Sequence, residues 1–323
     1  MFTHTRLVFL VLAAPLVVAV GCSTSSPTPT APTPTAPTLT AAASGAQFPV
    51  TIHAANGTVT ITTKPMAIVS LSPTATEMLY AIGAGPQVKA VDKFSDYPPG
   101  TPLTTLDGNS PNVEAIAAYQ PDLVVASQLT PGLAAQLNAL GITVLNDPAA
   151  ENLDQEYQQF LQLGQATGHP DAATAEVATI KTQIAQIVAS TPKPGRPTPY
   201  YYELDPTYYS ETSSTFIGQV LGLLGLHSIA DSATGAAAAG GYPQLNAEFI
   251  LHANPAYILL ADTICCTQSA LTVAARPGWS HLAAVTHGRV LGLNDDIASR
   301  WGPRIVVLLH QVATELAQHP AAS

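Results

Sequence analysis

Two segments of the chain, beginning at Asn112 and Asn246, align with each other without a gap. In each, a Glu follows the Asn by two residues, a Pro follows that Glu by seven, and an apolar run comes next. This order is typical of a short helix with an Asn N-cap, a stop at Pro and a buried strand. The duplication predicts two α/β lobes of similar plan within one chain.

The stretch from residue 67 to residue 99 predicts how the first lobe begins. Residues 67–71 are a short apolar run with the length of a buried strand, and a helix and a second strand at Val88–Val91 follow. The loop Asp92–Pro99 comes next and is rich in polar and aromatic groups. This order is half of a doubly wound unit, in which ligands bind just beyond the strand ends. We therefore predict an α/β fold of two doubly wound lobes, with this loop as one wall of a cleft between them.

Thr74 and Ser72 are the two candidates for the N-cap of the first helix. Thr74 and Glu77 have the spacing of a capping box, and Ser72 followed by Pro73 is an equally good start. Both alternatives stay open at this point, and Glu77 is interpreted as a residue of the helix start.

One long helical segment lies between the two lobes. Its apolar residues recur at helical spacing, from Asp171 as the expected N-cap to a proline-rich stop at 191–195. Tyr157 and Phe160 indicate an earlier helix that ends near residues 164–168. The predicted parts are a β-hairpin extension at 48–64, an N-terminal lobe at 65–150, connecting helices at 151–195 and a C-terminal lobe at 196–323.

The N-terminus carries the pattern of an export signal. Arg6 precedes an apolar run at 7–20 that is too short to span a membrane comfortably, and Gly21 and Cys22 follow. We predict a signal peptide at 1–21 and a lipidated Cys22 that anchors an extracytoplasmic protein to the bacterial cell membrane. The alternative is an ordinary signal peptide with a chance Cys. Residues 22–47 are mostly Ser, Thr, Pro and Ala, which predicts a disordered tether.

Composition and motifs exclude several classes of function. Only 10% of the residues are charged, the formal net charge is −10, and the 11 Lys and Arg residues form no cluster. A nucleic-acid groove needs a concentrated basic surface, so nucleic acid is not an expected partner. The sequence has no nucleophile elbow, phosphate loop or HExxH motif. We therefore expect neither an enzyme, nor a metal site, nor a resident cofactor.

Cys265 and Cys266 are adjacent and follow an apolar run. If Cys22 carries lipid, these two have only each other as partners within the chain. Two alternatives stay open, a vicinal disulfide in an oxidising exported location and a pair of buried thiols. Either pair is expected in a cleft wall.

Tyrosines mark the start of the second lobe. Tyr200–Tyr202 are predicted to form a strand, with Tyr201 in the core. Tyr208 and Tyr209 fall in the loop at its end, where tyrosines suit a recognition pocket because they combine apolar area with a hydroxyl.

Arg300 and Trp301 lie in a loop between a predicted strand at 289–293 and the last helix. That position places Arg300 at the cleft, where it can hydrogen-bond a ligand. Arg304 is expected to pack at the helix start instead.

Several segments together resemble the lipid-anchored or periplasmic substrate-binding proteins of ABC importers for vitamin B12 and iron-siderophores. They appear in family order over residues 65–320, as IVSLSPTATEMLYAIG, FSDYPP, NVEAIAAYQPDLVVA, YPQLNAEFILHANPAYILLA and SRWGPRI. The strongest local match is to the cobalamin-binding branch. The resemblance implies two α/β lobes joined by one long rigid helix, and a monomer that delivers a metal chelate to the transmembrane subunits of an ABC permease.

The resemblance also assigns residues. Family members dock onto permease arginines through one exposed Glu on each lobe, and Glu114 and Glu248 match that pattern. The alternative is that each Glu only favours a helix N-terminus. Tyr97, Tyr242 and Arg300 match family cleft positions. The predicted ligand contacts are Ser72, Phe94, Tyr97, Tyr208, Tyr209, Tyr242, Arg300 and Trp301.

One position departs from the family. Cobalamin binders can place a Trp shortly before the first-lobe Glu, and Gly108 takes that place here. The platform under a corrin ring is then thinner, so haem or a ferric siderophore is an alternative ligand. Only Arg300, Arg276 and Lys93 are available to an anionic siderophore, which favours a bulky ligand of low net charge. A cell-surface protein with a vestigial cleft is a further alternative.

Overall fold

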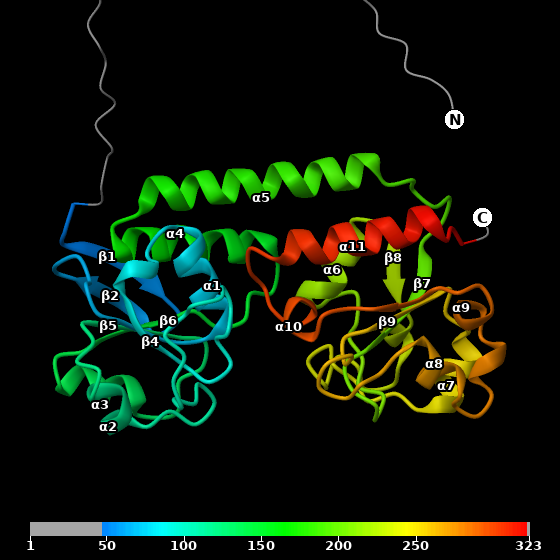
Figure 1. Ribbon diagram of the computed structural model, residues 1–323, viewed down its shortest axis with the longest axis horizontal. Coiled ribbons are helices and arrows are strands. Elements are labelled where there is room, and N and C mark those ends of the chain that lie inside the picture. Colours follow the sequence, from blue (N-terminus) through cyan, green and yellow to red (C-terminus); the bar gives the residue numbers. More distant parts are fainter. Residues whose placement is uncertain (1–46, 322–323) are drawn as a thin grey trace, which may run out of the picture. The chain divides into compact units, whose positions relative to one another are not determined.

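The computed structural model describes residues 47–321, whose helices and strands are shown in Figure 1. The predicted signal peptide, Cys22 and all but the last residue of the predicted tether lie outside the described residues. The elements up to the connection are β1 (Val50–Ala54), β2 (Gly57–Ile61), β3 (Ile68–Leu71), α1 (Pro73–Ala81), β4 (Val88–Val91), α2 (Val113–Ala117), β5 (Leu123–Ala126), α3 (Leu133–Ala139) and β6 (Thr143–Asn146). The connection consists of α4 (Leu153–Thr167) and α5 (Pro170–Ser190). The remaining elements are β7 (Thr198–Glu203), α6 (Phe216–Gly222), β8 (Leu226–Ser228), α7 (Ala247–Ala253), β9 (Tyr257–Leu260), α8 (Ala270–Ala274), α9 (Ala283–Thr286), β10 (Val290–Gly292), α10 (Asp295–Ala298) and α11 (Ile305–Gln318).

Each lobe is built on a four-stranded parallel sheet. The order is β4-β3-β5-β6 in the N-terminal lobe and β8-β7-β9-β10 in the C-terminal lobe. The two orders correspond strand by strand, since the first strand of each lobe pairs with the second and third strands, and the fourth is at the edge. The predicted α/β fold with two lobes of similar plan is therefore confirmed.

The duplicated segments fold in the same way. Asn112 caps α2 by accepting a 2.8 Å hydrogen bond from the amide of Ala115, and Asn246 caps α7 by accepting one of 2.8 Å from the amide of Phe249. β5 and β9 follow the two helices. The shared pattern of Asn cap, helix and strand thus predicted equivalent elements correctly.

The start of α1 decides between the two proposed caps. The hydroxyl of Ser72 accepts a hydrogen bond from the amide of Ala75 at 3.3 Å, and Pro73 is the first helical residue. Thr74 lies inside the helix, so the capping-box alternative is wrong. Glu77 is the central residue of α1 rather than a residue of its start.

The strands are buried on both faces, so consecutive residues belong to different apolar clusters. Ile68 and Leu123 join a cluster that also contains residues of β7, α4, α5 and α11. Val69 and Val124 point the other way, into a second cluster with α2 and α3. A third cluster covers the opposite face of the C-terminal sheet, under α7 and α8. The first cluster runs through both lobes, so they share one continuous core.

The connection differs from expectation at its start. His169 is the N-cap of α5, so Asp171 is the second helical residue rather than the cap. α4 ends at Gly168, whose φ of +79° is the left-handed conformation that glycine adopts readily. α11 packs along α5 (Figure 1), so the last helix of the chain supports the connecting helix. That α5 acts as a rigid link stays a prediction.

Candidate functional site

All strands of a parallel sheet have their carboxyl ends on the same side of the sheet, which we call its carboxyl edge. The loops at this edge are the expected ligand-binding elements. In the N-terminal lobe the Asp92–Pro99 loop follows β4. The hydroxyl of Thr76 donates to the hydroxyl oxygen of Ser95 at 3.0 Å, which ties this loop to α1. Phe94 and Tyr97 remain 44% and 41% exposed. The loop therefore presents two aromatic rings at the carboxyl edge of its sheet.

Glu77 forms ion pairs with two arginines that follow the C-terminal sheet. Its Oε1 lies 2.6 Å from Nη2 of Arg304 and 3.0 Å from Nη1 of Arg300, and its Oε2 accepts from Nε of Arg304 at 2.8 Å. The Glu77 side chain is 1% exposed. The interpretation of Glu77 as a helix-start residue is therefore wrong, because its carboxylate is the buried anion of a contact between the lobes. The sequence offered one signal of this role, because Glu77 is the only charged residue of α1.

Arg300 makes further contacts at the same place. Its Nη2 donates to the carbonyl of Phe94 at 3.0 Å and to Oδ1 of Asp296 at 2.6 Å, and its Nη1 lies 3.6 Å from Oδ1 of Asp96. We call Glu77, Asp96, Asp296, Arg300 and Arg304 the interlobe ion-pair cluster. The guanidinium of Arg300 is thus neutralised by carboxylates, and its role in binding a ligand stays a prediction.

Two other predicted contacts hold the fold in this structure. Ser72 is 1% exposed and caps α1, and its role as a ligand contact stays a prediction. Trp301 is half-buried, and its Nε1 donates to Oε1 of Gln159 in α4 at 2.9 Å. The indole therefore links the loop before α11 to the connecting helices, next to the interlobe ion-pair cluster.

Gly108 occupies a position that excludes a side chain. A Cβ there would overlap the carbonyl oxygen of Leu71 and lie 2.8 Å from Oδ2 of Asp92. A Trp cannot replace Gly108 without a shift of the backbone. Close packing against the backbone of β3 therefore accounts for the glycine at this position.

In the C-terminal lobe, Tyr209 and Tyr242 lie on paired segments. The amide of Ser210 donates to the carbonyl of Pro243 at 3.0 Å, and Tyr209 forms a β-bridge with Gln244. Tyr209 is 41% and Tyr242 is 45% exposed. The structure therefore brings two of the predicted tyrosines to one surface, beyond the carboxyl end of β7.

The other tyrosines of this lobe pack inward. Tyr201 is fully buried, as expected. Tyr208 is half-buried and stacks on Trp279, with 5.8 Å between the ring centres. Its φ of +72° is rare for a residue with a side chain. Tyr208 thus supports the wall more than it extends from it.

A buried acid pair lies at the carboxyl end of β7 and just beyond that of β9. Both oxygens of Glu203 accept hydrogen bonds from the guanidinium of Arg276, at 2.5 and 2.6 Å. Asp262 is fully buried, and burial and the nearby Glu203 carboxylate raise the pKa of Asp262 to about 7. Sequence reasoning missed this group, because Arg276 and Glu203 are 73 residues apart.

The two predicted docking residues are exposed and equivalent. Glu114 is the second residue of α2 and Glu248 is the second residue of α7. An acid at this position also interacts favourably with the helix dipole, so position alone does not distinguish docking from helix stabilisation.

Cys265 and Cys266 are joined in a vicinal disulfide. Cys265 is exposed and Cys266 is half-buried, so the alternative of two buried thiols is wrong for this structure.

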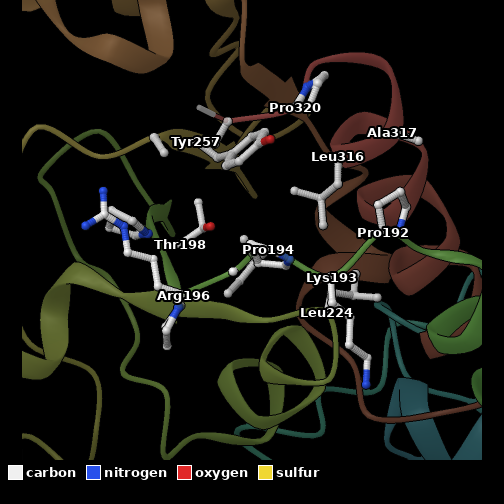
Figure 2. A pocket seen from close by; sticks show the side chains of 16 residues that line it. Pro192, Lys193, Pro194, Arg196, Thr198, Leu224, Tyr257, Leu316, Ala317 and Pro320 are labelled. Carbon is white, nitrogen blue, oxygen red and sulfur yellow. The ribbon is translucent and has the colours of Figure 1, made fainter. Parts of the chain in front are cut away.

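Figure 2 shows a cavity of about 730 Å³ in the C-terminal lobe. Thr198, Leu226 and Tyr257 line it, and they are the first residues of β7, β8 and β9. The cavity therefore lies at the amino ends of the strands, opposite the edge where the predicted contacts gather.

Two further features are absent from the described part of the chain, a cluster of metal ligands and a helix able to cross a membrane. In residues 47–321, no three or more His, Cys, Asp or Glu side chains gather where they could hold a metal ion. No helix in that range combines the length and apolar character needed to cross a membrane.

Comparison with known proteins identifies the family. A family model described as periplasmic binding protein matches residues 68–297, more than half of the chain. The chain belongs to the periplasmic binding protein family. Members of this family are a class of substrate-binding proteins rather than a class of enzymes.

Two relatives of this periplasmic binding protein match it over most of their length. YvrC of Bacillus subtilis strain 168, named an uncharacterized ABC transporter substrate-binding lipoprotein, is 32% identical over 279 residues, which are 83% of this chain and 86% of YvrC. A protein of Halobacterium salinarum named cobalamin-binding protein is 31% identical over 312 residues, which are 93% of this chain and 83% of that protein.

Solved structures share the fold. The vitamin B12-binding protein BtuF of Vibrio cholerae superposes with a TM-score of 0.64 at 26% identity, over 80% of this chain and 99% of BtuF. The haem-binding protein BhuT, solved with two haems, has a TM-score of 0.69 at 19% identity, over 80% of this chain and all of BhuT. The second match supports the fold alone.

Proposed function

We propose that this chain is the extracytoplasmic substrate-binding protein of an ABC importer, and that it captures a corrinoid or another bulky metal chelate of low net charge between its lobes. Support for the class comes from the family and from relatives named ABC transporter substrate-binding lipoprotein and cobalamin-binding protein. The protein acts as a monomer, anchored to the membrane through Cys22, and delivers its ligand to the transmembrane subunits of the permease.

The ion pairs of the basic residues favour a ligand of low net charge over an anionic siderophore. Arg300, Arg276 and Lys93 are the cations expected at an anionic siderophore, and each forms an ion pair with a carboxylate, Lys93 with Asp107 at 2.8 Å. An anionic ligand would have to break such pairs. Exposed aromatic rings on both lobes instead suit the apolar faces of a large, nearly neutral chelate.

A titration of the purified protein tests the ligand. We expect cyanocobalamin to bind saturably and to quench the fluorescence of Trp301, which lies beside the interlobe ion-pair cluster. Trp279 is fully buried, so a Trp301→Phe variant separates the two reporters while calorimetry follows binding. Saturation by haem or by a ferric siderophore without a response to cyanocobalamin would overturn the corrinoid proposal.

Charge reversal tests docking onto the permease. We expect Glu114→Arg and Glu248→Arg each to lower ligand uptake by about tenfold or more, because like charges placed opposite each other cost several kcal/mol. Ligand affinity of the purified variants is expected to be unchanged, since neither residue is among the proposed contacts. Uptake in cells that carry the cognate permease is the measurement.

Asp171→Arg is the matched control for docking. Asp171 is also an exposed acid at the second position of a helix, so its reversal removes the same dipole interaction. Equal uptake by the Asp171, Glu114 and Glu248 variants would assign both glutamates to helix stability alone.

A further inference from the structure

The vicinal disulfide lies in a loop that leaves the carboxyl end of β9. Residues 262–268 form this loop, and the amide of Gln268 donates to the carbonyl of Asp262 at 3.3 Å to close its base. Ile264 is 59% exposed and Cys265 is exposed next to it. The loop thus presents an apolar surface at the same edge of the sheet as Tyr209 and Tyr242.

One carboxylate holds this exposed loop in place. Asp295 accepts hydrogen bonds from the hydroxyl of Thr263 at 3.1 Å, from the amide of Ile264 at 3.0 Å and from the amide of Cys265 at 2.7 Å. Because three donors converge on it, the loop cannot turn Ile264 inward without losing charge-assisted hydrogen bonds.

The neighbours of the loop place it beside the candidate site. Asp296, next to Asp295, pairs with Arg300 in the interlobe ion-pair cluster. At the other end, Gln268 accepts from Arg276 at 2.8 Å, and the Arg276 guanidinium lies 5.6 Å from the ring centre of Tyr208. The loop therefore lies between two groups of predicted contacts.

The disulfide has little to contribute to global stability. A disulfide stabilises mainly by closing a loop in the unfolded chain, and the gain grows with the number of residues enclosed. Cys265 and Cys266 are neighbours, so their bond encloses no loop. Its effect is local: it fixes two side chains and replaces two weak thiol donors with a soft, polarizable surface.

We propose that the 262–268 loop is a specificity-determining contact of the C-terminal lobe, which packs Ile264 and the disulfide sulfurs against an apolar face of the bound chelate. The inference rests on the proposed function and names a contact for it. The loop selects ligands with a large apolar surface over compact, highly charged chelates.

Affinity of the loop variants tests this contact. We expect Cys265→Ser/Cys266→Ser and Ile264→Ser each to weaken binding about tenfold, through loss of apolar contact. The probe is whichever of cyanocobalamin, haem and ferrichrome saturates the wild-type protein. Melting temperatures are expected to stay close to the wild-type value, since the disulfide encloses no loop. Val307→Ser, which removes a 50% exposed aliphatic side chain from α11, is the matched control and leaves affinity unchanged.

A second measurement needs no variant. A saturating concentration of the same probe is expected to slow reduction of the wild-type disulfide by a phosphine at least fivefold, as read by thiol alkylation and mass spectrometry. Unchanged affinity in both loop variants, or an unchanged reduction rate, would overturn the inference and leave the proposed function standing. Absence of saturable binding of any of the three probes to the wild-type protein would overturn both.

Discussion

Glu77→Gln is expected to lower the free energy of unfolding by about 3 kcal/mol, because it removes a buried anion and leaves two arginine side chains short of a partner. Arg304 is affected more than Arg300. Among residues 47–321, Glu77 has the only carboxylate within ion-pair distance of the Arg304 guanidinium. Arg300 keeps Asp296 and the carbonyl of Phe94. The measurement is urea denaturation at pH 7, followed by circular dichroism.

An exposed ion pair supplies the control for Glu77. Lys93 and Asp107 also pair at 2.8 Å, but their side chains are 46% and 29% exposed. Solvent screens such a pair, so Asp107→Asn is expected to have a much smaller effect. A loss in Glu77→Gln no larger than that in Asp107→Asn would show that the interlobe ion-pair cluster does not stabilise the fold.

Glu156→Gln is expected to stabilise the protein at high pH. Glu156 is fully buried in α4, neither carboxylate oxygen has a hydrogen-bond partner, and burial raises the pKa of Glu156 from 4.5 to about 8. Between these values the folded state holds a proton that the unfolded chain has released, so the contribution of Glu156 to the free energy of unfolding falls as the pH rises. Glutamine does not ionise and removes this loss.

The expected gain for Glu156→Gln is about 5 kcal/mol at pH 9 and about 1 kcal/mol at pH 5, since each pKa unit corresponds to about 1.4 kcal/mol and the unfolded carboxyl is already mostly ionised at pH 5. Urea denaturation of both proteins between these pH values measures it. Asp147, Glu211 and Asp262 also have a raised pKa, but they are present in both proteins, so the difference isolates Glu156.

Asp154→Asn is the control for Glu156, because Asp154 is an exposed acid in the same turn of α4. The Asp154→Asn variant keeps the buried carboxyl of Glu156, so the gain of several kcal/mol at high pH is expected to be absent from it. Parallel pH curves for wild type and Glu156→Gln would mean that the Glu156 carboxyl ionises freely in the folded protein.

The elements of each lobe could be predicted from the chain because their signals are local. Asn112 and Asn246 bond to amides three residues away, so a cap, a helix and a strand are specified within one short segment. The duplication of that segment then predicted two equivalent sheets. The aromatic loop residues Phe94 and Tyr97 could be placed at a strand end for the same reason.

The contacts between the lobes could not be predicted in this way. Glu77 and Arg304 are 227 residues apart, and Glu203 and Arg276 are 73 apart, so no spacing along the chain couples them. From the sequence, Glu77 can be assigned only to a helix. Its burial and its contacts with two guanidinium groups arise from the packing of the lobes. The amino-acid sequence alone thus determined the two lobes and their aromatic loops. Tertiary packing decided which charges are neutralised, and which side chains remain free to meet a ligand.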